Sequence, residues 1–428
     1  MSEKLDPPRL PNIPPEVLPL RARQWRVPDT FSSLRHRNFQ LYVGGQLISN
    51  IGTWMQIIAQ GWLVYELSHS ELALGIVGFA SAIPALLVTP WGGVLVDRVS
   101  NRTLLIITQA LQMISAFILA ALTFSGIVQV WHVVALAAAL GFVNAVDGPA
   151  RQAFVVDMVG RADMPNAIAI NSMTFNSARI FGPAVGGLLL AWIGADWCFL
   201  VNGLSFLAVI AGLWMMQLPP HKPRGGKLSP WQQMRSGVVY AMNIVEIRAL
   251  LIMAFILSTF GITYSTVMPA FVKEVLNAGP QAFGVVNASA GIGAILAAVM
   301  IARYGNQGGR GKWLSWVALL FPLALTAFAW NHQYYLAMFL AMLLGVGFMS
   351  QFTLINTLLQ TSISDEMRGR VLSLYTLTFF GFTPFGNLAI GAVAERWGLS
   401  VALSGSAIIT LILSAWVIGR TPELRALQ

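Results

Sequence analysis

Residues 165–218 read PNAIAINSMTFNSARIFGPAVGGLLLAWIGADWCFLVNGLSFLAVIAGLWMMQL, and this stretch decides the fold class. Only Arg179 and Asp196 carry charge within it. A helix that crosses the hydrocarbon core of a bilayer needs about 20 mostly apolar residues. Two such helices fit here, Pro165–Trp192 and Trp197–Leu218, with a very short turn between them. The stretch therefore predicts a pair of membrane-spanning helices rather than the core of a soluble domain.

The composition of the whole chain agrees with a membrane protein. Of 428 residues, 56% are apolar and 10% are charged, and the mean hydropathy is +0.68. Soluble domains carry about 25% charged residues, so lipid is the expected solvent for most of this surface. The one cysteine, Cys198, cannot form an intramolecular disulfide. The histidines lie at the ends of apolar runs, which predicts no metal site, and we expect no cofactor.

Apolar runs of spanning length occur on both sides of one long polar gap. They cover residues 39–66, 72–96, 103–124, 131–148, 165–192 and 197–218, then 249–272, 282–303, 313–330, 334–360, 371–394 and 401–419. This pattern predicts an all-α polytopic membrane protein with twelve transmembrane helices in two pseudo-symmetric six-helix halves. The expected segments are a disordered tail (1–33), a first half (34–218), a central loop with room for an amphipathic helix (219–248), a second half (249–420) and a second tail (421–428).

Basic residues set the expected orientation, because loops rich in Lys and Arg stay in the cytosol. The chain contains 26 Lys and Arg residues. If both termini are cytosolic, only Lys273 and Arg396 fall on the outer side and only Arg179 lies inside a span. The net charge of +9 is then a topology signal. We therefore expect the lipid bilayer, and no nucleic acid, as a partner.

A weak repeat relates the two halves. Its members are Pro183, Gly187 and Gly194 in the fifth run, and Pro384, Gly391 and Gly398 in the eleventh. Each proline-bearing run is followed by a very short turn and another apolar run. Parallel six-helix repeats of this kind are typical of transporters that work by alternating access.

The loop after the second run carries a recognisable signature. It reads GVLVDRVSNR from Gly93 to Arg102. This resembles the G-x-L-a-D-R-x-G-R-K signature of the major facilitator superfamily, in the usual place. It departs from that signature at Ser100 and Asn101.

The resemblance implies a cytosolic gate. Asp97 would face the N-terminus of the eleventh helix near Arg370, where the helix dipole is positive. Arg98 or Arg102 would assist this contact and latch the cytosolic side shut. The alternative is a plain charged turn that only helps to set topology.

A second signature lies in the fifth run. Gly182, Pro183, Gly186 and Gly187 match the G-P-x-x-G-G core of the motif that is associated with antiporters and exporters in the superfamily. Small residues let helix backbones approach one another, and proline bends a helix. The alternative is a chance match, since glycine and proline are common in membrane helices.

Two further segments, Pro149–Met158 and Asp365–Val371, resemble a bacterial subgroup that contains the enterobactin exporter and related transmembrane secretion effector proteins. The resemblance extends from Leu34 to Arg420. It implies a drug:proton antiporter of twelve helices in the bacterial inner (plasma) membrane. It also implies export of a siderophore-like or drug-like molecule, coupling to protons, and a monomer.

Polar stripes mark four helices that the superfamily architecture places around a central pathway. Residues of one stripe share a face at 100° per residue. The candidate substrate-cavity residues are Gln46, Asn50, Thr53, Gln56 and Gln60 in the first run, Asn144 in the fourth, Thr263 and Tyr264 in the seventh, and Thr353, Asn356, Thr357 and Gln360 in the tenth. Hydrogen bonding between packed helices is the alternative explanation.

Three charged residues are candidates for coupling or substrate binding. Asp147 is the best embedded acid for proton coupling, but a pair with Arg151 four residues later would keep it ionised and inert. Arg179 lies in the middle of a span and needs a partner, which can be an acid, carbonyl groups or an anionic substrate. A clamp between helices is the alternative role for Arg179.

These features favour a secondary active exporter. An uptake permease of the same fold, and a membrane receptor or scaffold that transports nothing, remain alternatives. No G-x4-G-K-[ST], H-E-x-x-H or G-x-S-x-G pattern occurs in the chain, so we expect no enzyme activity.

Overall fold

The computed structural model describes residues 29–160, 162–217, 230–304 and 308–427. These residues form helices and connecting turns, with no strand among them. The first part of the chain forms η1 (Asp29–Arg35), α1 (Arg37–Ser68), α2 (Glu71–Arg98), α3 (Asn101–Phe124), α4 (Val130–Val159), α5 (Met164–Met215) and α6 (Pro230–Asn243). The second part forms α7 (Val245–Ile256), η2 (Leu257–Gly261), η3 (Ile262–Ser265), α8 (Met268–Ala270), η4 (Phe271–Val275), α9 (Pro280–Tyr304), α10 (Arg310–Ala329), α11 (Tyr334–Ser362), α12 (Asp365–Trp397), α13 (Leu399–Arg420) and α14 (Glu423–Ala426).

Ten helices in the described residues are long and apolar enough to cross a bilayer. These ten include the 52-residue α5 as a single helix. They do not include α1, although α1 is 32 residues long. The all-α membrane fold predicted from the sequence is therefore confirmed, while the number twelve stays a prediction.

Two glycines turn the chain sharply at equivalent places. Gly194 interrupts α5 with φ 89° and ψ 171°, and Gly398 separates α12 from α13 with φ 87° and ψ 157°. Both lie in the left-handed region of φ that residues with a Cβ rarely adopt. The matching backbone angles agree with the repeat seen in the sequence.

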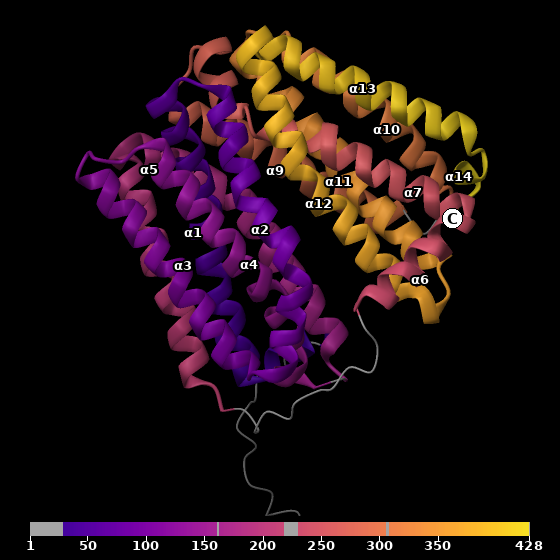
Figure 1. Cartoon of the computed structure of the whole chain (residues 1–428), viewed down its shortest axis with the longest axis horizontal. Helices are drawn as coiled ribbons and strands as arrows, with labels where there is room; N and C mark the ends of the chain where they lie inside the picture. The colour runs from indigo at the N-terminus through magenta and orange to yellow at the C-terminus, as the bar shows by residue number, and fades with distance from the viewer. Residues whose placement is uncertain (1–28, 161, 218–229, 305–307, 428) are drawn as a thin grey trace, which may run out of the picture.

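The helices form two bundles that lean together at one end (Figure 1). The first bundle contains α1 to α5, and the second contains α7 to α13. They touch mainly through α2 against α12 and α5 against α9, with α1 also reaching α8. We call the end with the short connections the short-turn face; it is made by residues 69–70, 125–129, 194, 276–279, 330–333 and 398. The opposite end, which carries α6, is the α6 face.

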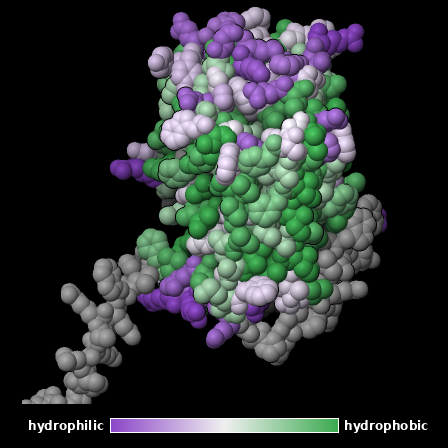
Figure 2. All heavy atoms as spheres, turned by 90° about the vertical axis from the view of Figure 1, so that its left-hand side faces the viewer, coloured by the Kyte–Doolittle hydropathy of each residue, from purple (hydrophilic) through white to green (hydrophobic). Residues whose placement is uncertain are grey.

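An apolar belt surrounds the middle of the molecule. Figure 2 shows hydrophobic side chains between two hydrophilic ends on the outer side of the first bundle. Large apolar side chains remain exposed, among them Ile57, Leu111, Phe142 and Trp192. A soluble monomer does not leave an apolar surface of this extent in water. The protein therefore passes through a membrane several times.

Two helices differ in detail from the sequence prediction. α4 continues to Val159 instead of ending near Gly148, because Pro149 removes one backbone donor without breaking the remaining turns. The seventh run is irregular: Leu257–Gly261 is a π-helical turn and Ile262–Ser265 a 3-10 turn. Irregular turns of this kind inside helices occur often at functional sites.

Candidate functional site

Backbones of the two bundles meet closely near the short-turn face. A Cβ placed on Gly284 of α9 would lie 2.5 Å from Cα of Gly187 in α5. A Cβ on Gly391 of α12 would lie 2.5 Å from the carbonyl oxygen of Glu71 and 3.1 Å from Cα of Gly75 in α2. Only glycine leaves room for these contacts. Gly187 and Gly391, which the repeat relates, thus occupy equivalent places between the bundles.

Polar contacts join the bundles at the same end. The Tyr65 hydroxyl of α1 donates a hydrogen bond to Glu274 of η4. The Lys273 ammonium lies 3.9 Å from the Glu66 carboxylate, and 5.8 Å from the ring centroids of Trp62 and Tyr65. Sequence reasoning missed this cluster, because its members lie at the ends of helices that are far apart in the chain.

The glycines of the G-P-x-x-G-G segment face two different neighbours. A Cβ on Gly186 would lie 2.9 Å from Cα of Met55, and a Cβ on Gly182 would lie 3.0 Å from the carbonyl oxygen of Ile51. These two glycines therefore pack α5 on α1 inside the first bundle, with Pro183 between them in the same helix. Gly187 instead faces α9 of the second bundle.

Asp147 lies in a buried polar cluster within the first bundle. Its side chain accepts hydrogen bonds from Thr108 Oγ1 at 2.6 Å and from Gln109 Nε2 at 3.0 Å, both on α3. Arg151 Nε donates to the second carboxylate oxygen of Asp147. Another nitrogen of Arg151 donates to the side-chain oxygen of Gln46 on α1. The predicted pair of Asp147 and Arg151 is thus formed and shared among three helices.

The α3 members of this cluster were missed by sequence reasoning. Thr108, Gln109 and Gln112 are polar residues in an otherwise apolar run, and they share a helix face by their spacing. Their position on one helix face is the same signal that marks the polar stripes of the first, fourth, seventh and tenth runs. Gln112 Nε2 lies 3.4 Å from Oδ1 of Asn144, which is exposed at the middle of α4.

Some polar residues of the α1 stripe are buried inside the first bundle, and others are partly accessible. Gln56 accepts a hydrogen bond of 2.6 Å from Asn202 in the second segment of α5, and like Gln46 it is buried inside the first bundle. Thr53, Asn50 and Gln60 are half-buried. The Thr53 hydroxyl donates to the carbonyl oxygen of Ser49, 2.9 Å away.

The stripes of the second bundle are partly open. In α11, Thr353, Asn356 and Thr357 are half-buried and Gln360 is exposed, donating to Oδ1 of Asn356 at 2.5 Å. In η3, by contrast, Thr263 is buried and its hydroxyl lies 3.3 Å from the carbonyl oxygen of Phe260.

Arg179 lies between the bundles at mid-depth. Its guanidinium carbon is 5.6 Å from the ring centroid of Phe348, at the middle of α11. Tyr264 of η3 is close enough to the guanidinium to interact with it electrostatically. A cation–π contact contributes about 0.5–2 kcal/mol, less than the several kcal/mol that removing an ion from water costs. We call Arg179, Tyr264 and Phe348 the mid-depth site.

The predicted cytosolic gate is only partly within the described residues. The side chains of 89–98, which include Gly93, Asp97 and Arg98, lie outside them. Arg102 donates to the carbonyl oxygen of Trp214 at 2.9 Å. Arg370 donates to Ser236 Oγ of α6 at 2.9 Å, beside a hollow of about 580 Å³ between α6 and α12. The described contacts of Arg102 and Arg370 thus stay within their own halves of the chain.

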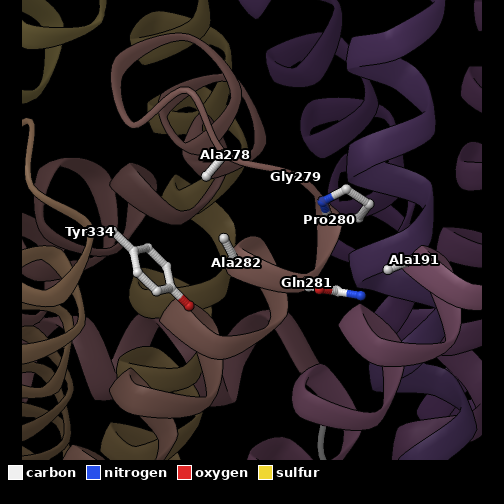
Figure 3. Close-up of a pocket in the computed structure, with 7 residues that line it drawn as sticks. All are labelled: Ala191, Ala278, Gly279, Pro280, Gln281, Ala282 and Tyr334. Atoms are coloured by element: carbon white, nitrogen blue, oxygen red, sulfur yellow. The ribbon is translucent and has the colours of Figure 1, made fainter.

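Another hollow, of about 560 Å³, lies on the short-turn face (Figure 3). It is lined by Ala191, residues 278–282 and Tyr334, none of which is charged. The mid-depth site, which places a charged group, a phenol and an aromatic ring between the two bundles, is therefore a better candidate for substrate binding than either hollow.

Comparison with known proteins agrees with the fold and with the sequence signatures. The family model described as "Transmembrane secretion effector" matches residues 28–427. The "Staphyloferrin A transporter" of Staphylococcus aureus is 26% identical over 381 residues, covering 88% of this chain and 94% of the relative. The "Multidrug efflux pump Tap" of Mycolicibacterium fortuitum is 24% identical over 393 residues, covering 89% and 95%.

Solved structures share the fold at low sequence identity. A mutant of the nucleoside transporter NupG aligns with a TM-score of 0.72 and 15% identity over 90% of this chain and 99% of that one. A bacterial homologue of the human lysosomal transporter Spinster aligns with a TM-score of 0.68 and 14% identity over 93% and 99%. The resemblance inferred from the loop and glycine signatures is confirmed: the chain belongs to the transmembrane secretion effector family of the major facilitator superfamily.

Proposed function

We propose that this protein is a secondary active exporter of a small organic molecule. It would work by alternating access, with the two bundles rocking around the mid-depth site. The observation that carries the proposal is the packing of α5. This one helix holds Arg179 between the bundles and, about 12 Å further along at 1.5 Å per residue, presses Gly187 on Gly284. A movement of α5 when substrate binds near Arg179 would therefore also change the contact of Gly187 with Gly284, which closes the short-turn face.

Relatives support the outward direction. One of them is named a multidrug efflux pump, and another a transporter of a siderophore, staphyloferrin A. The antiporter-type segment Gly182–Gly187 agrees with export.

The proposed orientation follows from charge. Basic residues gather at the α6 face, so this face and both termini would lie in the cytosol and the short-turn face outside the bacterial plasma membrane. In this orientation the described contacts between the bundles lie at mid-depth and toward the outer side. Coupling to protons is the simplest energy source, and the protein would act as a monomer without a cofactor.

Dye accumulation in cells that lack their own efflux pumps tests the proposal. Cells with and without this protein would be loaded with a panel of fluorescent dyes and a labelled siderophore, then treated with a protonophore. We expect lower accumulation in cells that express the protein, and recovery when the proton gradient collapses. Equal amounts of membrane-inserted protein, measured by immunoblot, are the control for comparing variants.

The opposite results are equally informative. Higher accumulation with the protein present would mean uptake, and the segment Gly182–Gly187 would then not be an indicator of export in this protein. Export that is insensitive to the protonophore but sensitive to removal of another ion would support the proposed export and would show that this ion, rather than the proton, drives transport.

A further inference from the structure

Two hydrogen-bond donors at the mid-depth site have no acceptor within the part of the chain that the structure describes. Among the described residues, neither the Arg179 guanidinium nor the Tyr264 hydroxyl makes a hydrogen bond or an ion pair; Tyr264 is buried and Arg179 is half-buried between the helices. Arginine stays charged in proteins, so the positive charge cannot be avoided by losing a proton. A charge of this kind within a membrane is expected to meet a counter-charge.

The acids of the described chain do not supply that counter-charge. Asp147 is occupied by Arg151, Thr108 and Gln109. The acids toward the short-turn face are Glu66, Glu71, Asp196, Glu274 and Glu395, and those toward the α6 face are Asp157, Asp163, Glu246, Glu366 and Glu423. The ion pairs found among the described residues join His36 to Asp163, Arg151 to Asp147 and Lys273 to Glu66, and none of them includes Arg179.

The two donors come from different bundles. Arg179 belongs to α5 in the first, whereas Tyr264 belongs to η3 and Phe348 to α11 in the second. An acceptor placed between Arg179 and Tyr264 would therefore touch both bundles at once. A ligand held in this way responds to their relative movement.

Aromatic rings cover the α11 side of the mid-depth site. Phe348 and Phe352 stack with their centroids 6.1 Å apart, and Phe379 of α12 lies 5.1 Å from Phe352. This wall suits an apolar or aromatic group. Guanidinium groups bind carboxylates through two parallel hydrogen bonds, which fixes the orientation of the charged end.

We propose that the substrate is an organic anion with an apolar body, most simply an aromatic or aliphatic carboxylate. Its carboxylate binds Arg179 and accepts a hydrogen bond from Tyr264, and its body lies toward the rings of Phe348 and Phe352. This inference rests on the proposed transport function and adds the substrate class.

Binding to the purified full-length protein in detergent tests the inference. The probes are benzoate, 2-naphthoate and biphenyl-4-carboxylate, each compared with its neutral amide, so that shape is kept and charge is removed. Isothermal titration would give the affinities. We expect at least one carboxylate to bind about 10- to 100-fold more tightly than its amide, which is the range for a charge-assisted pair.

Variants locate the effect. Arg179→Gln should remove the preference for the carboxylate, Arg179→Lys should keep part of it, and Tyr264→Phe should weaken carboxylate binding several-fold while leaving the amide unchanged. Arg396→Gln is the matched control, because Arg396 also stacks on a ring, 5.3 Å from the Trp397 centroid, but lies at the short-turn face. It should bind the carboxylate as the native protein does.

The inference is wrong if none of the three carboxylates is preferred over its amide by the native protein. It is equally wrong if Arg179→Gln keeps the preference. Should that variant fail to fold, Arg179→Lys and Tyr264→Phe decide in the same way. Because titration needs neither a gradient nor a direction, a negative result would leave export standing, whereas carboxylate binding without export in the dye assay would remove only the proposed function.

Discussion

Asp147 is the residue whose surroundings say most about its role. Two neutral donors and the Arg151 guanidinium donate hydrogen bonds to its carboxylate oxygens. Its side chain is 7% exposed and that of Arg151 is 23% exposed. We therefore interpret the pair as a structural link between α3, α4 and α1 rather than as the coupling site.

This interpretation gives a prediction for Asp147→Asn. Removing one partner leaves a buried charge alone, so the variant should lose about 3–5 kcal/mol of stability. The double variant Asp147→Asn with Arg151→Gln should recover part of that loss. Thermal unfolding of purified protein measures both effects. A stable Asp147→Asn protein that no longer responds to the proton gradient would instead make Asp147 the coupling residue.

Asp97 belongs to the predicted latch. Asp97→Asn should slow turnover up to about thirtyfold while membrane insertion stays normal, because an anion near a helix N-terminus contributes about 0.3–2 kcal/mol. Dye export normalised to membrane-inserted protein is the measurement. Glu423→Gln, an exposed acid on α14, is the control. Normal export by Asp97→Asn would contradict the gate.

At the scale of helices, the contact of α5 with α9 leaves no room for a larger side chain. A Cβ on Gly187 would overlap Cα of Gly284, so Gly187→Val should hold the bundles apart at the short-turn face. Overpacking costs about 1–3 kcal/mol, which corresponds to a shift of about 5- to 160-fold away from the closed arrangement. Export should fall accordingly, with normal insertion.

Gly405→Val is the matched control for this helix contact. Nothing lies within 4 Å of a Cβ at Gly405 in α13, so this variant should export normally. Equal activity of Gly187→Val and Gly405→Val would show that the close approach of α5 and α9 is not needed for the cycle.

The short helix η1 gives a pH-dependent prediction. His36 lies 2.8 Å from Asp163 Oδ2, and Ser32 donates to Oδ1 at 2.7 Å. These hydrogen bonds, that of His36 first, lower the pKa of Asp163. A lowered pKa means that the Asp163 contribution to docking is present above about pH 4 and is lost as the pH falls through the lowered value.

Hydrogen exchange of residues 29–36 measures this docking. Protection should be reduced by Asp163→Asn at pH 7, and below about pH 4 the native protein should approach the variant. Equal protection of the two proteins at neutral pH would mean that η1 is held by other contacts, such as the hydrogen bond of 2.6 Å from Ser33 Oγ to Asn166.

The helices themselves could be predicted well from the sequence, because lipid requires long apolar runs and leaves turns at polar residues. The turns at Gly194 and Gly398 follow the same rule, because each lies in the short break between two long apolar runs, and the repeat places both breaks at equivalent positions. Neighbours of a helix face could not be predicted. The α1 stripe puts Gln46 and Gln56 on one arc, but an arc does not say whether it meets Arg151 and Asn202 inside the bundle or the space between bundles.

At the scale of the whole molecule, polar contacts hold the two bundles together at the short-turn face. Lys273→Ala should weaken this closure by about two- to fivefold, since exposed ion pairs contribute up to about 1 kcal/mol. Tyr264→Cys, in a Cys198→Ser background, would report the change through labelling by a membrane-impermeant maleimide added to whole cells. Faster labelling with Lys273→Ala is expected; unchanged labelling would assign closure to the glycine contacts alone.

The arrangement of the bundles explains why the mid-depth site was only half predicted. Arg179 stands out in the sequence as a charge within an apolar run, and Tyr264 as a polar residue in the seventh. Phe348 gives no such signal, because an aromatic residue is ordinary in a membrane helix. Its place beside Arg179 depends on how α11 meets α5, and that is set by the packing of α9 between them.

A guanidinium at mid-depth that has no ion-pair partner among the described residues would also make the transport cycle sensitive to voltage. Moving one elementary charge through the full potential changes the energy by about 2.3 kcal/mol per 100 mV, and a partial movement by a proportional share. If the cycle shifts Arg179 along the membrane normal, the empty carrier is pulled by the electric field, while a carrier neutralised by a bound anion is not. The potential would then act on the return of the empty protein rather than on the step that moves the cargo.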